Sequence, residues 1–395
     1  MSALSLRFRS SLPLVVALSG AIASALSLWG ASHKGLFNEV AGFGAGMAAG
    51  SIASSIVAGG MSLAFTTGDD YDRSVIYHAR KGFVMPALVA TAVVASLSYA
   101  VTTSIPPAAV FCGGLTVAAN IYSELDAVLL QRHGRVTLWA TLTCISRLLA
   151  PALVMVTSSY AVPLVTTSLA LALSVKVSTS RLRPPSFDGS PVSALRHAYS
   201  GELAVYTIAD TLALRAPLLV APLALKGITA GKAATLISSQ QTVLGVTASA
   251  LYASMALQSG VAADSSPHVM KSQRKFDKML ISLSAVSAVC GVVLIPAFPI
   301  VLDIPSDYAF SAFWTALCLA IPVGTLVRYK QYGSISVGNR AIATKSAVCS
   351  ACVAAAICLI SLTTENSTAL ITLGICAILS ELSALLFIFT QVRKS

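Results

Sequence analysis

Charged residues are scarce in this sequence. Asp, Glu, Lys and Arg make up only 10% of its 395 residues, whereas roughly a quarter of the residues in a soluble domain are charged. Hydrophobic residues reach 56%, and the mean hydropathy is +0.81. A water-soluble fold of this size has no core large enough to bury so much apolar surface. The composition therefore excludes a soluble protein and indicates an integral membrane protein.

Signatures of catalysis are also missing. The sequence has no Gly-rich phosphate loop with a lysine, no H-E-x-x-H and no G-x-S-x-G. The absence of a phosphate loop argues against an ATP-driven pump. We therefore expect no enzyme activity and no cofactor, and transport that is either facilitated or coupled to a gradient of H⁺ or Na⁺.

Histidine and cysteine offer no intramembrane chemistry. The five histidines fall in predicted loops or at predicted helix ends, which excludes a histidine proton relay inside the membrane. Cys349 and Cys352 have C-x-x-C spacing, but they lie in an apolar run without a nearby histidine. The sequence thus predicts packed thiols and no metal site.

Long apolar runs fill nearly the whole chain. A transmembrane helix needs about 20 mostly apolar residues, and twelve runs of suitable length are present: 11–29, 40–65, 83–103, 108–130, 136–156, 160–177, 203–225, 233–257, 279–300, 310–327, 346–362 and 369–389. The predicted fold is all-α, with two parallel bundles of six transmembrane helices.

The positive charges are distributed unevenly among the gaps between these runs. Every second gap is rich in Lys and Arg, including Arg80, Lys81 and Arg328, whereas gaps of the other parity contain only Lys34, Lys226 and Lys232. By the positive-inside rule, both termini are cytoplasmic in a multi-pass protein of the inner (cytoplasmic) membrane. This alternation explains the net charge of +11 better than nucleic-acid binding does, so we expect no nucleic-acid partner.

A polar, proline-containing segment divides the chain in the middle. It predicts an N-terminal bundle at 1–177, a cytoplasmic linker at 178–197 and a C-terminal bundle at 198–395. Six spans in each half imply a parallel repeat about an axis along the membrane normal. In the second span small residues recur at every fourth position, namely Gly42, Gly46, Gly50, Ser54 and Ala58. Such a helix face either packs tightly and statically against a neighbouring helix, or slides against it or lines a lumen.

A few ionisable residues lie within the predicted spans. Each costs about 2.5–3.5 kcal/mol at mid-bilayer on insertion scales, so each needs a partner or a watery cavity. They are Glu124 and Asp126 in the fourth span, Arg147 in the fifth, Asp210 and Arg215 in the seventh and Glu381 in the twelfth. Asp210 and Arg215 are about 140° apart around their helix, which argues against a simple pair within it.

Two interpretations of these residues remain open. Arg147 and Arg215 either bind an anion in a lumen or pair with a carboxylate such as Glu124 or Asp210. Asp210, Glu124 and Asp126 are candidates for ion coupling or for lumenal carboxylates. Glu202, Tyr206 and Asp210 recur every four residues and form one polar helix face.

Three segments together resemble one transporter family. They are Leu-Leu-Gln-Arg-His-Gly-Arg at 129–135, the seventh span with Asp210 followed by Arg215, and the connection from Ile295-Pro296 to Ser306-Asp307-Tyr308-Ala309. This pattern is similar to the polysaccharide and O-antigen flippases (Wzx-like) of the multidrug/oligosaccharidyl-lipid/polysaccharide (MOP) exporter superfamily. The resemblance implies that the two six-helix bundles surround a central cavity. It also implies a transporter that flips an undecaprenyl-pyrophosphate-linked oligosaccharide from the cytoplasmic to the outer leaflet by alternating access.

The resemblance also suggests roles and partners. Arg147 and Arg215 would bind the pyrophosphate, while Gln240, Gln241 and Tyr206 are possible glycan contacts. Besides the phospholipid bilayer and the lipid-linked oligosaccharide, a polysaccharide polymerase or a glycosyltransferase is a possible partner. The alternatives are an ion-coupled multidrug or small-molecule antiporter of the same superfamily, a transport-inactive scaffold, and a membrane enzyme of envelope polysaccharide assembly.

Overall fold

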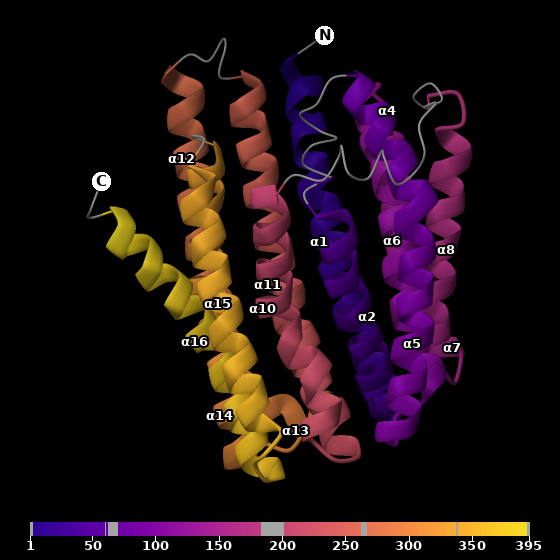
Figure 1. The fold of residues 1–395 in the computed structure, drawn as a ribbon, viewed down its shortest axis with the longest axis vertical. Helices are drawn as coiled ribbons and strands as arrows, with labels where there is room; N and C mark the ends of the chain where they lie inside the picture. The colour runs from indigo at the N-terminus through magenta and orange to yellow at the C-terminus, as the bar shows by residue number, and fades with distance from the viewer. Residues whose placement is uncertain are drawn as a thin grey trace.

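A computed structural model describes residues 3–59, 61, 70–182, 201–261, 267–336 and 339–392, and all secondary structure in these ranges is helical. Each of the twelve predicted spans overlaps one long helix (Figure 1). These helices are α1 (Ala3–His33), α2 (Phe37–Ala58), α5 (Met85–Thr102), α6 (Pro107–Arg132), α7 (Val136–Val156), α8 (Ala161–Ser178), α10 (Gly201–Ala224), α11 (Ile228–Val261), α12 (Pro267–Val293), α14 (Tyr308–Ser336), α15 (Arg340–Ser361) and α16 (Asn366–Val392). The all-α prediction is confirmed.

Length and composition identify a multi-pass membrane protein. Within the described ranges nine helices are long and apolar enough to cross a bilayer. The number rises to ten if one bent pair, Lys278–Val293 with Ile295–Val301, is a single span. The bend of 47° falls where α12 gives way to the short helices η2 (Ile295–Ala297) and α13 (Phe298–Val301).

The third span begins earlier than its apolar run. Helix α4 (Asp70–Ala79) continues through one π-helical turn, η1 (Arg80–Val84), directly into α5. Arg80 and Lys81 therefore lie on a helix, and the prediction that they occupy a loop after the second span is wrong. Hydropathy placed the start of the predicted span after these cations, but their carboxylate partners on α6 allow the helix to include them.

The helices of the two halves pack in the same pattern. In the first half α2 packs on α6, α1 on α7 and α6 on α8; in the second half the corresponding pairs are α11 with α14, α10 with α15 and α14 with α16. The halves meet where α2 contacts α10 and α11, and where α1 contacts α11. Helix α1 begins at the upper end of the molecule in Figure 1 and α16 ends in the same half, so we call this the end that carries the termini. Most of the predicted linker 178–197 lies outside the described residues.

Helix α2 approaches α6 at backbone distance. A Cβ atom on Gly46 would overlap the carbonyl oxygen of Val110, and one on Gly113 would overlap that of Phe43. Gly42 and Gly50 of the same stripe also face α6. These contacts lie within the first bundle, so they agree with the static-packing interpretation of the small residues.

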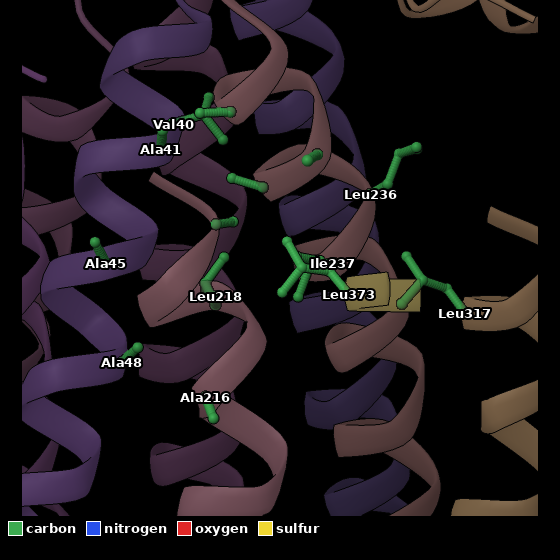
Figure 2. Packing of buried hydrophobic residues seen from close by; sticks show 14 of the residues in the cluster. Val40, Ala41, Ala45, Ala48, Ala216, Leu218, Leu236, Ile237, Leu317 and Leu373 are labelled. Atoms are coloured by element: carbon green, nitrogen blue, oxygen red, sulfur yellow. The ribbon is translucent and has the colours of Figure 1, made fainter. Parts of the chain in front are cut away.

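A second small face of α2 packs against the other half. A Cβ on Gly44 would lie 2.9 Å from Leu218 of α10, and Ser55 donates a hydrogen bond of 2.7 Å to Thr211. Near the end that carries the termini, a Cβ on Gly59 would lie 2.9 Å from the Cα of Ala204. Leu218 belongs to a buried cluster that joins residues of both halves, part of which is drawn in Figure 2. The halves thus touch along the length of α2.

At the opposite end of the molecule, Lys34 and Glu39 hold the turn between α7 and α8. The Lys34 ammonium donates to the carbonyl oxygens of Val154 (3.1 Å) and Met155 (2.7 Å) at the end of α7. One Glu39 carboxylate oxygen accepts hydrogen bonds from Ser159 Oγ and from the amides that begin α8, Tyr160 N and Ala161 N. Each charge complements the dipole of the helix end it meets. This contact explains why a lysine occurs in a gap otherwise poor in positive charge.

We predict that Glu39→Ala destabilises the protein by about 1–3 kcal/mol, because it leaves two backbone amides and a hydroxyl at the start of α8 without their acceptor. The measurement is the thermal unfolding midpoint of the purified protein in detergent. Glu39→Gln keeps an acceptor oxygen but removes the charge, so its unfolding midpoint should lie between those of the parent protein and Glu39→Ala. An unchanged midpoint for Glu39→Ala would contradict this role.

Candidate functional site

Arg328 of α14 is the centre of a buried charge cluster in the second half. Its Nη1 lies 2.7 Å from Glu381 Oε1 on α16, and its Nη2 lies 3.3 Å from Asp210 Oδ1 on α10. The Arg328 side chain is only 3% exposed, and Nη1 also donates to the carbonyl oxygen of Gly324. One guanidinium therefore ties three helices together.

This cluster lies well inside the helices. Arg328, Asp210 and Glu381 are two to three turns from the end of their helices on the side that carries the termini, or about 12 to 17 Å at 1.5 Å per residue. The prediction that Arg328 lies in a cytoplasmic gap is wrong. The predicted span stopped at this cation, but α14 continues to Ser336 because two carboxylates from other helices neutralise it.

A neutral hydrogen-bond chain lies one turn from the cluster. The hydroxyl of Tyr206 donates to Gln331 Oε1 (3.3 Å), and Gln331 Nε2 donates to Ser346 Oγ (3.0 Å). Tyr206 precedes Asp210 by four residues, and Gln331 follows Arg328 by three. The predicted polar face of α10 therefore directs both Tyr206 and Asp210 toward α14. Tyr206 is buried, with its hydroxyl bonded to the protein.

The carboxylates of α6 form a separate cluster in the first half. Asp126 is fully buried and lies 3.0 Å from Lys81 Nζ; it also accepts hydrogen bonds from Tyr77 (3.0 Å) and Thr179 (3.1 Å). Glu124 Oε2 lies 3.0 Å from Arg80 Nη2. The π turn η1 thus presents two consecutive cations to two carboxylates of α6. The structure does not bring Glu124 or Asp126 together with Asp210, which lies in the other bundle.

Arg147 and Arg215 have neutral partners instead. Arg147 of α7 donates to the carbonyl oxygen of Val16 on α1, and it lies so close to Gly20 that a Cβ there would be 2.7 Å from Nη1. Arg215 of α10 donates to Gln241 Oε1 on α11. In the described part of the chain, neither arginine forms an ion pair. Glu124 and Asp210, the carboxylates suggested by the sequence, are paired with Arg80 and Arg328 instead.

The two arginines lie near the same contact between the halves. Ser24 of α1 and Thr242 of α11 share a hydrogen bond of 3.1 Å. Gly20, against which Arg147 packs, is one helical turn before Ser24, about 6 Å along the axis. Gln241, which binds Arg215, directly precedes Thr242. One guanidinium from each half therefore lies within about a turn of this α1–α11 contact. Gln240 is also on α11 and is buried.

Inside the described helices, the carboxylates of the two clusters have charged partners, whereas two of the arginines have neutral partners. Asp126, Glu124, Asp210 and Glu381 each have a cationic partner. Arg147 and Arg215 bind neutral groups instead, because the backbone carbonyl and the amide oxygen that accept from them carry no formal negative charge. The arrangement suits an anionic ligand between the halves better than a cationic one.

Sequence reasoning missed Arg328 and gave Glu381 no place in the candidate site. A signal for Arg328 was present, because Gly324, Arg328 and Gln331 recur at helical spacing across the predicted end of the span at residue 327. Helical spacing that continues past the predicted end of a span indicates that the helix continues too, with these polar residues on the face that packs in the bundle.

Comparisons with known proteins identify the fold. No protein-family model and no curated protein sequence matches the chain. The lipid II flippase MurJ, in an inward closed conformation, has 12% sequence identity and a TM-score of 0.58 over 99% of this chain and 87% of that one. The MATE multidrug transporter DinF-BH, in a complex, has 10% identity and a TM-score of 0.60, covering 98% and 95% of the two chains.

A third similar structure is a MOP-superfamily transporter from Pyrococcus furiosus, with 11% identity and a TM-score of 0.53 over 98% and 95% of the two chains. At these identities the similarity concerns the fold. The chain is a multi-pass membrane protein with the fold of the MOP-superfamily transporters.

We predict that Arg328→Ala destabilises the protein by about 3–5 kcal/mol, because it leaves two carboxylates without their cation in a buried site. The double variant Arg328→Met with Glu381→Leu should lose less, since it removes both members of the shortest pair. Thermal unfolding of the purified variants in detergent measures both effects. A double variant less stable than Arg328→Ala would contradict the ion-pair explanation.

Proposed function

We propose that this protein flips a lipid-linked oligosaccharide, carried on undecaprenyl pyrophosphate, from the cytoplasmic to the outer leaflet by alternating access. The observation that carries the proposal is the pair of guanidiniums, Arg147 and Arg215, that have neutral partners near the contact between the halves. The fold shared with a lipid II flippase supports the same substrate class. In this proposal both termini are cytoplasmic.

The chemistry of the substrate explains why arginines are needed. A pyrophosphate that leaves water for a low-dielectric passage loses hydration, so fixed cations must replace it. A guanidinium presents two parallel N–H groups to phosphate oxygens and stays charged at any physiological pH. Arginines whose charge is already cancelled by a carboxylate could not serve in this way. The lipid tail would remain in the bilayer during transport.

The charge balance favours this function over a multidrug antiporter of the same superfamily. Near the contact between the halves lie two guanidiniums with neutral partners, whereas the carboxylates of the two charge clusters pair with an arginine or lysine of their own bundle. A cationic drug would require the reverse arrangement. The fold shared with a MATE multidrug transporter keeps the antiporter as the second candidate. A membrane enzyme of polysaccharide assembly is less favoured because the structural neighbours are transporters.

The Arg328 cluster is our candidate for ion coupling. Asp210 and Glu381 together carry one negative charge more than Arg328 neutralises, and Asp210 keeps 27% of its side chain exposed. A carboxylate in this position can take up H⁺ or Na⁺. Ion binding there would weaken the contact between α10 and α14 and so bias the position of α10, the helix that also carries Arg215.

We predict that Arg215→Ala lowers glycolipid translocation at least tenfold, the effect of about 1.4 kcal/mol, and that Arg147→Ala has an effect of the same kind. Arg215→Lys should retain part of the activity, because the charge survives while the planar pair of donors is lost. Translocation is measured in vesicles, with the amount of inserted protein checked for every variant. Arg340→Ala, at the exposed start of α15, is the matched control. Normal transport by inserted Arg215→Ala would exclude the pyrophosphate role of this residue.

We predict that Asp210→Asn separates coupling from binding. The amide keeps the shape of the side chain but cannot exchange an ion, so substrate binding should remain while turnover becomes insensitive to an imposed H⁺ or Na⁺ gradient. The measurement compares translocation with and without each gradient in vesicles. If the variant responds to the gradients as the parent protein does, the coupling role belongs elsewhere.

A further inference from the structure

Gln241 joins Arg215 to the backbone of the helix that carries it. Its Oε1 accepts a hydrogen bond from Arg215 Nη1, and its Nε2 donates one of 2.6 Å to the carbonyl oxygen of Leu214. Gln241 is buried on α11, whereas Leu214 and Arg215 are consecutive residues of α10. Both ends of one amide are therefore bound to the same turn of the neighbouring helix.

This arrangement determines which way the amide points. The carbonyl of Leu214 can only accept, so it binds the NH₂ group of Gln241 and turns the amide oxygen toward the guanidinium. The oxygen accepts from one of the five N–H donors of Arg215, and within the described residues no other acceptor binds this guanidinium. The side chain of Arg215 is thus held in one orientation without being neutralised.

The contrast with Arg328 shows what a charged partner does at such a position. Glu381 lies 2.7 Å from Arg328 and cancels its charge. A neutral acceptor gives Arg215 a fixed position but leaves the charge available, which is the requirement for binding an anion.

We propose that Gln241 is a positioning residue that orients the Arg215 guanidinium toward the pyrophosphate of the substrate, in place of the glycan contact suggested by the sequence. The proposal rests on the proposed function of Arg215 as a pyrophosphate ligand. In this proposal Gln241 also determines specificity for an anionic carrier. A carboxylate at position 241 would form an ion pair with Arg215 and neutralise the charge that attracts the anion.

The test uses the full-length protein in liposomes with a polyprenyl pyrophosphate bearing one N-acetylhexosamine as transported probe and inorganic pyrophosphate as competitor. Gln241→Glu introduces the ion pair, and Gln241→Met keeps the volume but removes both hydrogen bonds. Gln391→Glu, the same change in the last turn of α16, is the matched control. Initial rates over a range of probe concentrations separate KM from kcat, and thermal midpoints report folding.

We expect Gln241→Glu to raise both the KM for the probe and the inhibition constant of pyrophosphate at least tenfold. Gln241→Met should raise both three- to tenfold with kcat within about twofold, since it disorders the guanidinium but keeps its charge. Gln391→Glu should match the parent protein. In an Arg215→Ala background, Gln241→Glu should cause no further loss, because both residues act as one unit.

Three outcomes would overturn the inference. If Arg215→Ala is defective but Gln241→Glu and Gln241→Met show parental inhibition by pyrophosphate, the positioning role fails and the proposed function stands. If Gln241→Glu lowers transport equally with and without Arg215, its effect is structural. If pyrophosphate does not inhibit the parent protein and Arg215→Ala transports normally, the proposed function fails and the role of Gln241 fails with it.

Discussion

Compensation of charge inside the helices is the constraint on which this structure depends, since an ionised group in a low-dielectric interior is stable only with a partner. Arg328 joins α14 to α10 and α16 through two carboxylates. On the other side of the molecule, Lys81 and Arg80 join the third span to α6, and Thr179 adds the end of α8. Each bundle therefore contains one ionic centre, and in the described part of the chain the two arginines of the candidate site have neutral partners instead.

The small residues of α2 serve a different purpose on each face. On one face Gly46 meets Val110 and Gly114 of α6 at backbone distance, which makes the first bundle compact. On the other face Gly44 and Ser55 meet α10 of the second bundle. Alternating access requires the bundles to move as units against each other. Tight packing within a bundle, combined with small side chains between bundles, is consistent with that requirement.

Much of the fold could be predicted because the bilayer imposes length and composition on each span. The twelve apolar runs correspond to the twelve long helices, and described connections such as 103–106, 133–135 and 225–227 are short. The errors occur where a charged residue lies inside a helix. Arg328, Arg80 and Lys81 ended predicted spans or fell between them, because hydropathy counts each residue alone and ignores a carboxylate supplied by another helix.

The sequence by itself determined the membrane class, the all-helical fold and the short set of ionisable residues that matter, since these follow from local composition and helical period. Only the tertiary structure decided which of those residues neutralise one another. Asp210 pairs with Arg328, more than a hundred residues away, whereas Arg215, five residues from Asp210, has an amide for a partner. Pairing depends on which helix faces meet across the bundle, and that geometry arises only when all the helices pack together.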